Sequence, residues 1–300
     1  MATRLYPRHG SQNVDRNSIK IKIDCKNRIA SNPESNETKD WLDLLSKFKH
    51  DPVNIKVYKA LLDKSKNIVA KIGKYKLDYE YEVAKKLEIL KMPTFIKFHC
   101  LFSCLDNFSE LKNTTKTVCK KIGDPISIII MPYIEGDRIE LWKWERNNFE
   151  LMKNTMKHVI MSMFYANKTI GFIHGDLHLG NVLLKKSKCK EISYGEFGTL
   201  EVTGLTPVIM DFDKSTFTET DKYSLYHDLD RFIGLMSLNC NVKFYYNEIE
   251  TFLDKNLRPL NSEINSVICN KLCGYIDKLE IRRVDSEPRS MPNWLKPQKV

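Results

Sequence analysis

The stretch FIHGDLHLGNVLL, residues 172–184, carries a carboxylate and a carboxamide five residues apart between two apolar segments. The carboxylate is Asp176 and the carboxamide is Asn181, and further along the apolar run VIM ends at a second carboxylate, Asp211. A carboxylate can orient an attacking hydroxyl, whereas carboxylate and amide oxygens can hold Mg²⁺ on phosphate groups. The order of these residues therefore favours phosphoryl transfer, with Asp176 orienting the hydroxyl and Asn181 and Asp211 as metal ligands.

The hydrophobic pattern around this stretch predicts alternating strands, one helix, more strands and then mostly helices. We expect strands at residues 53–62, 68–72, 126–136, 181–186 and 207–213, and helices at residues 79–90, 149–170 and 223–238. This order predicts an α+β fold with two lobes, a small and mostly β N-lobe and a mostly helical C-lobe, with a cleft where they join.

The remaining segments complete the expected domain organisation. Short helices are expected at 41–48 and 140–146, a polar loop at 106–125, a strand at 18–24 and a loop at 30–40. The expected boundaries are an N-terminal extension at 1–48, partly disordered, the N-lobe at 49–131, the C-lobe at 132–284 with a hinge at 132–136, and a flexible basic tail at 285–300.

Composition limits the classes of protein that this chain can represent. The 300 residues carry a formal charge of +10, which fits either a solvated Lys-rich surface or a polyanionic partner. No basic run marks a specific nucleic-acid motif, and no apolar run or signal peptide indicates a membrane span or export. We therefore expect an intracellular, cytoplasmic protein whose eight scattered cysteines are reduced and buried.

The two quoted motifs resemble those of the protein-kinase-like superfamily, in which H-R-D-x-x-x-x-N precedes a strand ending in D-F-G. Here the residues read His174-Gly-Asp176, then Asn181, and Asp211-Phe-Asp. The resemblance implies an upstream lysine on a strand, which Lys71 in IVAKI supplies, and a glutamate on the next helix to pair with it.

Two glutamates compete for the role of partner to Lys71. Glu80 shares its helical face with the apolar residues Val83, Ala84 and Leu87, whereas Glu82 shares its face with lysines. The apolar face should pack inward, so we expect Glu80 to be the partner and Glu82 to be its rival.

The same resemblance implies ATP as cofactor and places its adenine between the lobes. Met131 would be the gatekeeper, Pro132 would offer a carbonyl, and Ile134 would offer backbone N–H and C=O groups. Val69, on the strand face of Lys71, and Leu183, two residues after Asn181, would cover the two sides of the base.

Three features depart from the common pattern. Residues 49–57 lack the glycine-rich loop, and His178 stands where serine/threonine kinases carry a lysine. Only sixteen residues separate Asp211 from Asp228, which resembles the family's buried loop anchor, so no full activation segment fits.

These features look like haspin-type protein kinases and the divergent serine/threonine kinases of large DNA viruses. The resemblance implies an ATP- and Mg²⁺-dependent kinase of Ser/Thr hydroxyls, found in host cytoplasm or virion if viral. Its substrate would be a protein, which acidic or basic patches could guide. The alternatives are a small-molecule kinase of the aminoglycoside or choline type, with a deep acidic substrate pocket, and a pseudokinase scaffold that does not bind Mg-ATP.

Overall fold

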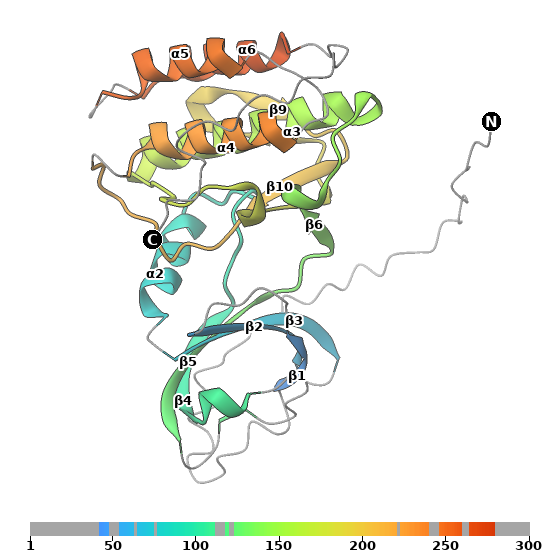
Figure 1. The fold of residues 1–300 in the computed structure, drawn as a ribbon, viewed down its shortest axis with the longest axis vertical. Helices are drawn as coiled ribbons and strands as arrows, with labels where there is room; N and C mark the ends of the chain where they lie inside the picture. The colour runs from blue at the N-terminus through green and yellow to red at the C-terminus, as the bar shows by residue number, and fades with distance from the viewer. Residues whose placement is uncertain are drawn as a thin grey trace, which may run out of the picture.

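The chain folds into a mostly β N-lobe and a mostly helical C-lobe, which lie at opposite ends of the molecule (Figure 1). The two-lobed α+β fold that the sequence predicts is therefore confirmed. The strand expected at 18–24, the loop at 30–40 and the tail at 285–300 lie outside the described residues. The computed structural model describes residues 42–47, 54–62, 65–74, 77–111, 118–119, 123–220, 223–239, 246–259 and 264–279.

An antiparallel sheet forms the N-lobe. Its five strands, in spatial order β1-β2-β3-β5-β4, are joined by antiparallel ladders, and the β1–β2 ladder shifts register between Leu44 and Ser46. The strands expected at 53–62, 68–72 and 126–136 are confirmed, and the last of them ends at a proline as expected. The strands are β1 (Leu42–Lys47), β2 (Ile55–Leu62), β3 (Lys66–Gly73), β4 (Cys100–Asp106) and β5 (Asp124–Pro132).

The short helix expected at 41–48 is wrong, because residues 42–47 form strand β1 at the edge of this sheet. Leu42 and Leu44 are buried and Leu45 is exposed, which is the period of a strand rather than of a helix. A six-residue apolar segment can adopt either structure, and pairing with β2 decides between them.

The two faces of the N-lobe sheet pack in different hydrophobic clusters. Ile68, Ala70 and Ile72 of β3 pack in a cluster confined to the N-lobe. Val69, between them, packs against the cluster that fills the C-lobe. Because side chains alternate along a strand, Lys71 lies on the same face as Val69, toward the C-lobe.

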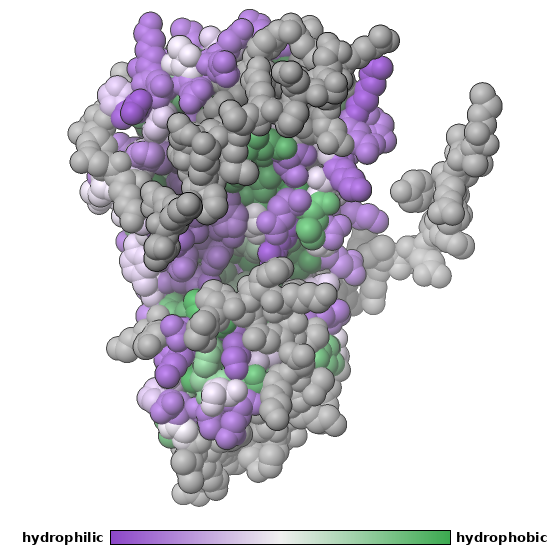
Figure 2. Space-filling view, in the orientation of Figure 1, coloured by the Kyte–Doolittle hydropathy of each residue, from purple (hydrophilic) through white to green (hydrophobic). Residues whose placement is uncertain are grey.

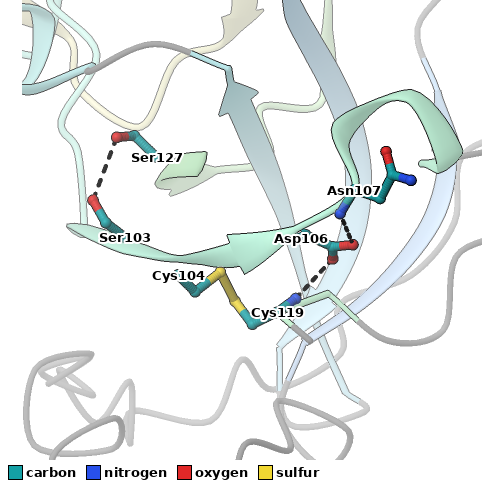
Figure 3. The surroundings of a disulfide bond; sticks show 6 residues. All are labelled: Ser103, Cys104, Asp106, Asn107, Cys119 and Ser127. Carbon is teal, nitrogen blue, oxygen red and sulfur yellow. Dashed lines mark hydrogen bonds between the residues drawn. A yellow bond between two sulfur atoms is a disulfide. The ribbon is translucent and has the colours of Figure 1, made fainter. Parts of the chain in front are cut away.

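The segment after β4 covers the outer face of the sheet. Leu111, Val118 and Cys119 are buried there, so the polar loop expected at 106–125 is wrong for these residues. Asp106, the last residue of β4, holds this segment: its carboxylate accepts the backbone N–H groups of Asn107 at 2.7 Å and Cys119 at 2.9 Å (Figure 3). Within the segment lies the short 3₁₀ helix η2 (Phe108–Glu110).

A disulfide joins Cys104 of β4 to Cys119 of the covering segment (Figure 3). Cys100 is disulfide-bonded as well. The expectation of reduced cysteines is therefore wrong for these three residues. It holds for Cys189, Cys269 and Cys273, which are free thiols, although Cys189 is only partly buried. Cys104 and Cys119 come together because the chain folds back over the sheet, which spacing alone does not reveal.

Helix α2 (Asp78–Glu88) lies between the sheet and the C-lobe (Figure 1). Its buried side chains are Glu80, Val83, Ala84 and Leu87, and the three apolar ones belong to the C-lobe cluster. The helix expected at 79–90 is confirmed, and its packing connects the N-lobe to the core of the C-lobe.

The C-lobe is built around helix α3 (Phe149–Ile170), which matches the helix expected at 149–170. Gly171 ends it with φ of +70°. Against it lie a three-stranded sheet, in the order β10-β7-β6, and the hairpin β8–β9. These strands are β6 (Gly136–Arg138), β7 (Val182–Lys186), β8 (Glu191–Ser193), β9 (Thr199–Glu201) and β10 (Leu205–Ile209).

Three further helices complete the C-lobe: α4 (Leu225–Asn239), α5 (Tyr246–Asn256) and α6 (Ser266–Asp277). The first confirms the helix expected at 223–238. The helix expected at 140–146 is wrong, because buried Trp144 anchors extended chain between two 3₁₀ turns. The 3₁₀ turns are η3 (Ile139–Leu141), η4 (Arg146–Asn148), η5 (Leu179–Asn181) and η6 (Gly195–Phe197).

Hydrophobic side chains on the surface in Figure 2 lie mainly toward the middle of the molecule, where the lobes meet. Where the chain is described, none of its helices is long and apolar enough to span a bilayer.

The disulfide gives a prediction about stability. A variant with both Cys104→Ser and Cys119→Ser should lose about 3 kcal/mol of unfolding free energy, because a bridge over a loop of about 15 residues restricts the unfolded chain by that amount. Urea denaturation of both proteins without reductant measures the difference. Equal stability, together with alkylation of both thiols in the wild-type protein, would contradict the disulfide.

Candidate active site

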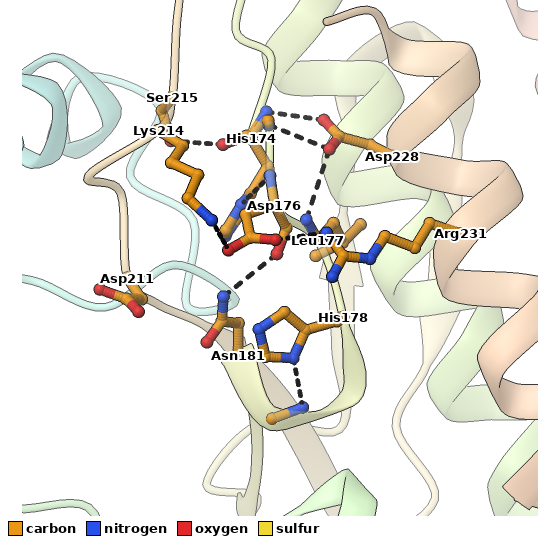
Figure 4. Close-up of polar contacts among 12 residues, drawn as sticks. His174, Asp176, Leu177, His178, Asn181, Asp211, Lys214, Ser215, Asp228 and Arg231 are labelled. Atoms are coloured by element: carbon orange, nitrogen blue, oxygen red, sulfur yellow. Dashed lines mark hydrogen bonds and ion pairs between the residues drawn. The ribbon is translucent and has the colours of Figure 1, made fainter. Parts of the chain in front are cut away.

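The loop that follows α3 is held by one buried carboxylate on α4 (Figure 4). Asp228 accepts the backbone N–H of His174 at 2.7 Å and that of Gly175 at 3.0 Å, and a longer bond from Leu177 at 3.5 Å. Burial raises the pKa of Asp228 to about 7, although the N–H groups favour the charged form. The expected loop anchor therefore lies where the sequence places it.

His174 fixes the same loop from its other side. Its ring is fully buried, its Nε2 lies 3.0 Å from the carbonyl oxygen of Met210, and its Nδ1 accepts the N–H of Asp176 at 3.3 Å. These partners assign a neutral ring with the proton on Nε2. Burial lowers the pKa of His174 to about 4, and the Met210 carbonyl opposes this only in part.

The segment after Asp211 lies directly against this loop. Ile173 and Thr216 exchange two backbone hydrogen bonds, of 2.8 and 2.9 Å. Ser215 Oγ donates to the carbonyl of His174 at 3.0 Å. Gly175 has φ of +76°, and a Cβ there would lie 2.3 Å from the carbonyl oxygen of Lys214. This close approach explains a glycine between His174 and Asp176.

Helix α2 also contacts this segment. The hydroxyl of Tyr79 donates to the carbonyl of Ser215 at 2.6 Å. The ammonium of Lys86 lies 4.2 Å from the centre of the Phe217 ring. The segment is thus fixed to both the loop that carries Asp176 and the N-lobe helix α2.

Two cations hold the carboxylate of Asp176. Lys214 Nζ lies 2.7 Å from Oδ2, and Arg231 Nη1 pairs with Oδ1. Burial acts to raise the pKa of Asp176, but the two cations outweigh it and hold the pKa below its ordinary value. The carboxylate is therefore ionised at neutral pH and can accept a hydrogen bond from a hydroxyl.

A cavity of about 350 Å³ opens beside Asp176. It leaves room on the solvent side of the carboxylate for an incoming group. Its walls are formed by Gly175, Asp176, Leu177, Lys214, Tyr223, His227, Asp228 and Arg231.

Lys71 joins the two lobes through two carboxylates. Its ammonium lies 2.7 Å from Glu80 Oε2 and 2.7 Å from Asp211 Oδ1. Burial acts to lower the pKa of Lys71, but the two carboxylates raise it above its ordinary value, so the ammonium stays charged. The rival residue, Glu82, is exposed, and its side chain points away from this site.

Asp211 itself has φ of +68°, in the left-handed region that Asp tolerates better than most residues. Its carboxylate remains 41% exposed beside Lys71, and Lys71 keeps its pKa low against the effect of burial. Asn181 donates through its amide nitrogen to the carbonyl of Asp176 at 3.1 Å, which leaves its oxygen as the atom for a metal.

A magnesium ion fits these side chains. No cluster of three or more His, Cys, Asp or Glu side chains that could hold a metal is found in the described ranges. Mg²⁺ usually takes one or two carboxylates and completes its shell with water and phosphate oxygens. One exposed carboxylate and one oriented amide oxygen, at Asp211 and Asn181, match that requirement.

The residues expected around the adenine lie where β3, β5 and β7 meet. Val69 is paired with Met131 in the β3–β5 ladder, and Pro132 ends β5 opposite Ile68. Val69, Ile134 and Leu183 are partly buried, and all three pack against the cluster that contains Met131. The structure thus brings four of the five expected residues into one apolar cluster. Of the segment that lacks a glycine-rich loop, residues 49–53 lie outside the described part of the chain.

Sequence reasoning missed Lys214 and Arg231. Lys214 directly follows the Asp-Phe-Asp motif, and Arg231 is one helical turn after Asp228 on the same face of α4, so their spacing carried a usable signal. His178, which stands where the common pattern has a lysine, caps η5, where its Nδ1 accepts the N–H of Gly180 at 3.0 Å.

Together, the fold and these contacts define a protein of the protein-kinase-like class. A family model described as the RIO domain matches residues 44–195, about half of the chain. The chain belongs to the RIO-domain family.

Comparison with curated proteins gives relatives of two kinds. An uncharacterised protein, 038R, of Invertebrate iridescent virus 3 is 27% identical over 180 residues, which cover 52% of this chain and 31% of that protein. The serine/threonine-protein kinase haspin of Mus musculus is 33% identical over 95 residues, covering 31% and 13%. Haspin of Bos taurus is 29% identical over 111 residues, covering 36% and 14%. The chain thus spans less than a third of the length of these relatives, and the expected viral and haspin resemblance is confirmed.

The buried His174 ring gives a prediction about pH. Because its pKa is about 4 when folded and about 6.5 when unfolded, the unfolded chain binds the extra proton first as the pH falls. The burial of the neutral ring should therefore lower the free energy of unfolding by about 2 kcal/mol when the pH falls from 7.5 to 5. Denaturant unfolding at both pH values should show a smaller loss for His174→Gln. An identical loss in both proteins would contradict the assigned protonation state.

Proposed function

We propose that this protein transfers the γ-phosphoryl group of ATP, in the presence of Mg²⁺, to Ser/Thr hydroxyls of proteins. The observation that carries the proposal is the ionised Asp176 held beside an open cavity, with Lys71, Glu80 and Asp211 joined across the lobes. Membership of the RIO-domain family and similarity to haspin support a protein kinase. The direct contacts of the Asp211–Phe217 segment support a kinase that needs no phosphorylation of an activation loop.

Each side chain has a part that follows from its chemistry. Asp176 accepts the hydrogen bond of the acceptor hydroxyl and orients its oxygen toward the phosphorus. Lys71, held by Glu80, binds the α- and β-phosphate oxygens. Asp211 and Asn181 would hold Mg²⁺, which when bound neutralises phosphate charge. The apolar cluster of Val69, Met131, Ile134 and Leu183, with the carbonyl of Pro132, would hold the adenine.

The test of the proposal separates chemistry from binding. Asp176→Ala should lower turnover by about 10²–10⁴-fold, the usual effect of losing a positioned acid–base group, while Mg-ATP affinity stays within a few-fold. The assay uses purified protein and radiolabelled ATP, with casein, histone, the protein itself, an aminoglycoside and choline as acceptors, and EDTA in place of Mg²⁺ as a control.

Three outcomes contradict the proposal in different ways. Wild-type turnover in the Asp176→Ala variant removes its assigned role. A wild-type protein that binds Mg-ATP and labels only small hydroxyl compounds is a small-molecule kinase. One that binds no nucleotide is a scaffold.

A second prediction concerns the partner of Lys71. Lys71→Met and Glu80→Gln should each lower turnover by at least about tenfold, the scale of one charge-assisted hydrogen bond. Glu82→Gln is the matched control, because it makes the same chemical change on the exposed face of α2 and should leave turnover unchanged. An inactive Glu82→Gln variant, together with an active Glu80→Gln variant, would falsify the assignment of Glu80 as the partner of Lys71.

A further inference from the structure

The position where many kinases carry a catalytic-loop lysine holds no cation here. His178 stands there, and its Nδ1 accepts a backbone N–H within η5. Burial lowers the pKa of His178, so the ring is neutral at physiological pH. A phosphoryl group in transfer carries negative charge on its oxygens, and a cation near it stabilises that charge. Beyond Lys71, a cation at this place could come only from a segment outside the loop, and one that lies beside Asp176 could supply it.

Lys214 meets this requirement by position. Its ammonium lies 2.7 Å from Asp176 Oδ2, the carboxylate that would orient the acceptor hydroxyl. A group that touches this carboxylate is also close to the phosphorus that the hydroxyl attacks, since reacting atoms approach to about 3–3.5 Å. Figure 4 shows its side chain reaching over the loop toward Asp176, on the side where Asp211 lies.

The backbone of Lys214 is fixed although its side chain is half exposed. Its carbonyl lies against Gly175, and the next residue, Ser215, is bonded to His174 and Tyr79. The side chain is 51% exposed, and among the described residues its ammonium pairs with Asp176. The ammonium has three donors, so it can bind a second acceptor without leaving the carboxylate.

Arg231 keeps Asp176 ionised when Lys214 also binds a phosphate oxygen. It pairs with Oδ1 from α4, on the other side of the carboxylate. If Lys214 turns toward a phosphate oxygen, Asp176 keeps one cationic partner and stays ionised. The two cations thus have separable tasks, one on each carboxylate oxygen.

From this geometry, and resting on the proposed function, we propose that Lys214 is a catalytic residue that contacts the γ-phosphate of bound ATP. It takes the place of the lysine that position 178 lacks, and Arg231 is the positioning residue that holds Asp176.

The test compares two nucleotides without using turnover. Calorimetry on the full chain measures the affinities of Mg-ADP and of the Mg²⁺ complex of the imido analogue of ATP. Lys214→Met should weaken the analogue by about tenfold and leave ADP within twofold, because only the analogue has a γ-phosphate. Lys214→Arg should retain part of the preference. Lys190→Met, an exposed lysine on the β7–β8 connection, is the matched control and should change neither affinity.

A separate comparison controls for the charge of Asp176. Removing Lys214 also leaves the charge of Asp176 less compensated, which alone would repel a γ-phosphate. The comparison is therefore repeated in an Asp176→Asn background, where that repulsion is absent. The analogue should still bind about tenfold more weakly without Lys214.

The outcomes distinguish this inference from the proposed function. Equal effects of Lys214→Met on both nucleotides, no effect on either, or an effect that disappears in the Asp176→Asn background each overturn the role of Lys214 alone. A wild-type protein that binds neither nucleotide overturns both the proposed function and this role.

Discussion

The carboxylate of Asp228 accepts backbone N–H groups from three residues of the loop that carries Asp176, and the rest of the site depends on this contact. A loop cannot place a side chain reliably unless its own polar groups are satisfied. Asp228 satisfies them from helix α4, and Arg231 of the same helix holds the Asp176 carboxylate. The His174 ring accepts the N–H of Asp176 and so fixes the turn as well. Helix α4 thus positions both the backbone of the loop and the side chain of Asp176.

The N-lobe reaches the same site through alternation along β3. Ile68, Ala70 and Ile72 of β3 pack in the N-lobe cluster, so Lys71 must face the C-lobe. There it meets Asp211 from the C-lobe and Glu80 from α2. Each of these charges is costly to bury alone, and together they compensate one another. The alignment of the lobes is therefore a condition for satisfying Lys71.

Much of this arrangement could be predicted from the sequence because it is local or follows a period. The helix at 149–170, the strand of Lys71 and the choice of Glu80 over Glu82 all follow from which face is apolar. Strand β1 was missed because a short apolar run takes its structure from its neighbour in the sheet. The Cys104–Cys119 bridge was missed because it joins segments whose approach only the folded chain determines. Lys214 was missed although it directly follows the Asp-Phe-Asp motif, because its pairing with Asp176 depends on how that segment lies against the loop.

The hydrogen bond of Tyr79 and the cation–π contact of Lys86 with the Asp211–Phe217 segment have a thermodynamic consequence. Helix α2 cannot rotate away from Lys71 without breaking its contacts with that segment, and the segment cannot detach without releasing α2. The two movements therefore share one equilibrium rather than two. By linkage, any ligand that binds more tightly to one element in its present position must also increase the population of the other in its present position, and by the same free energy.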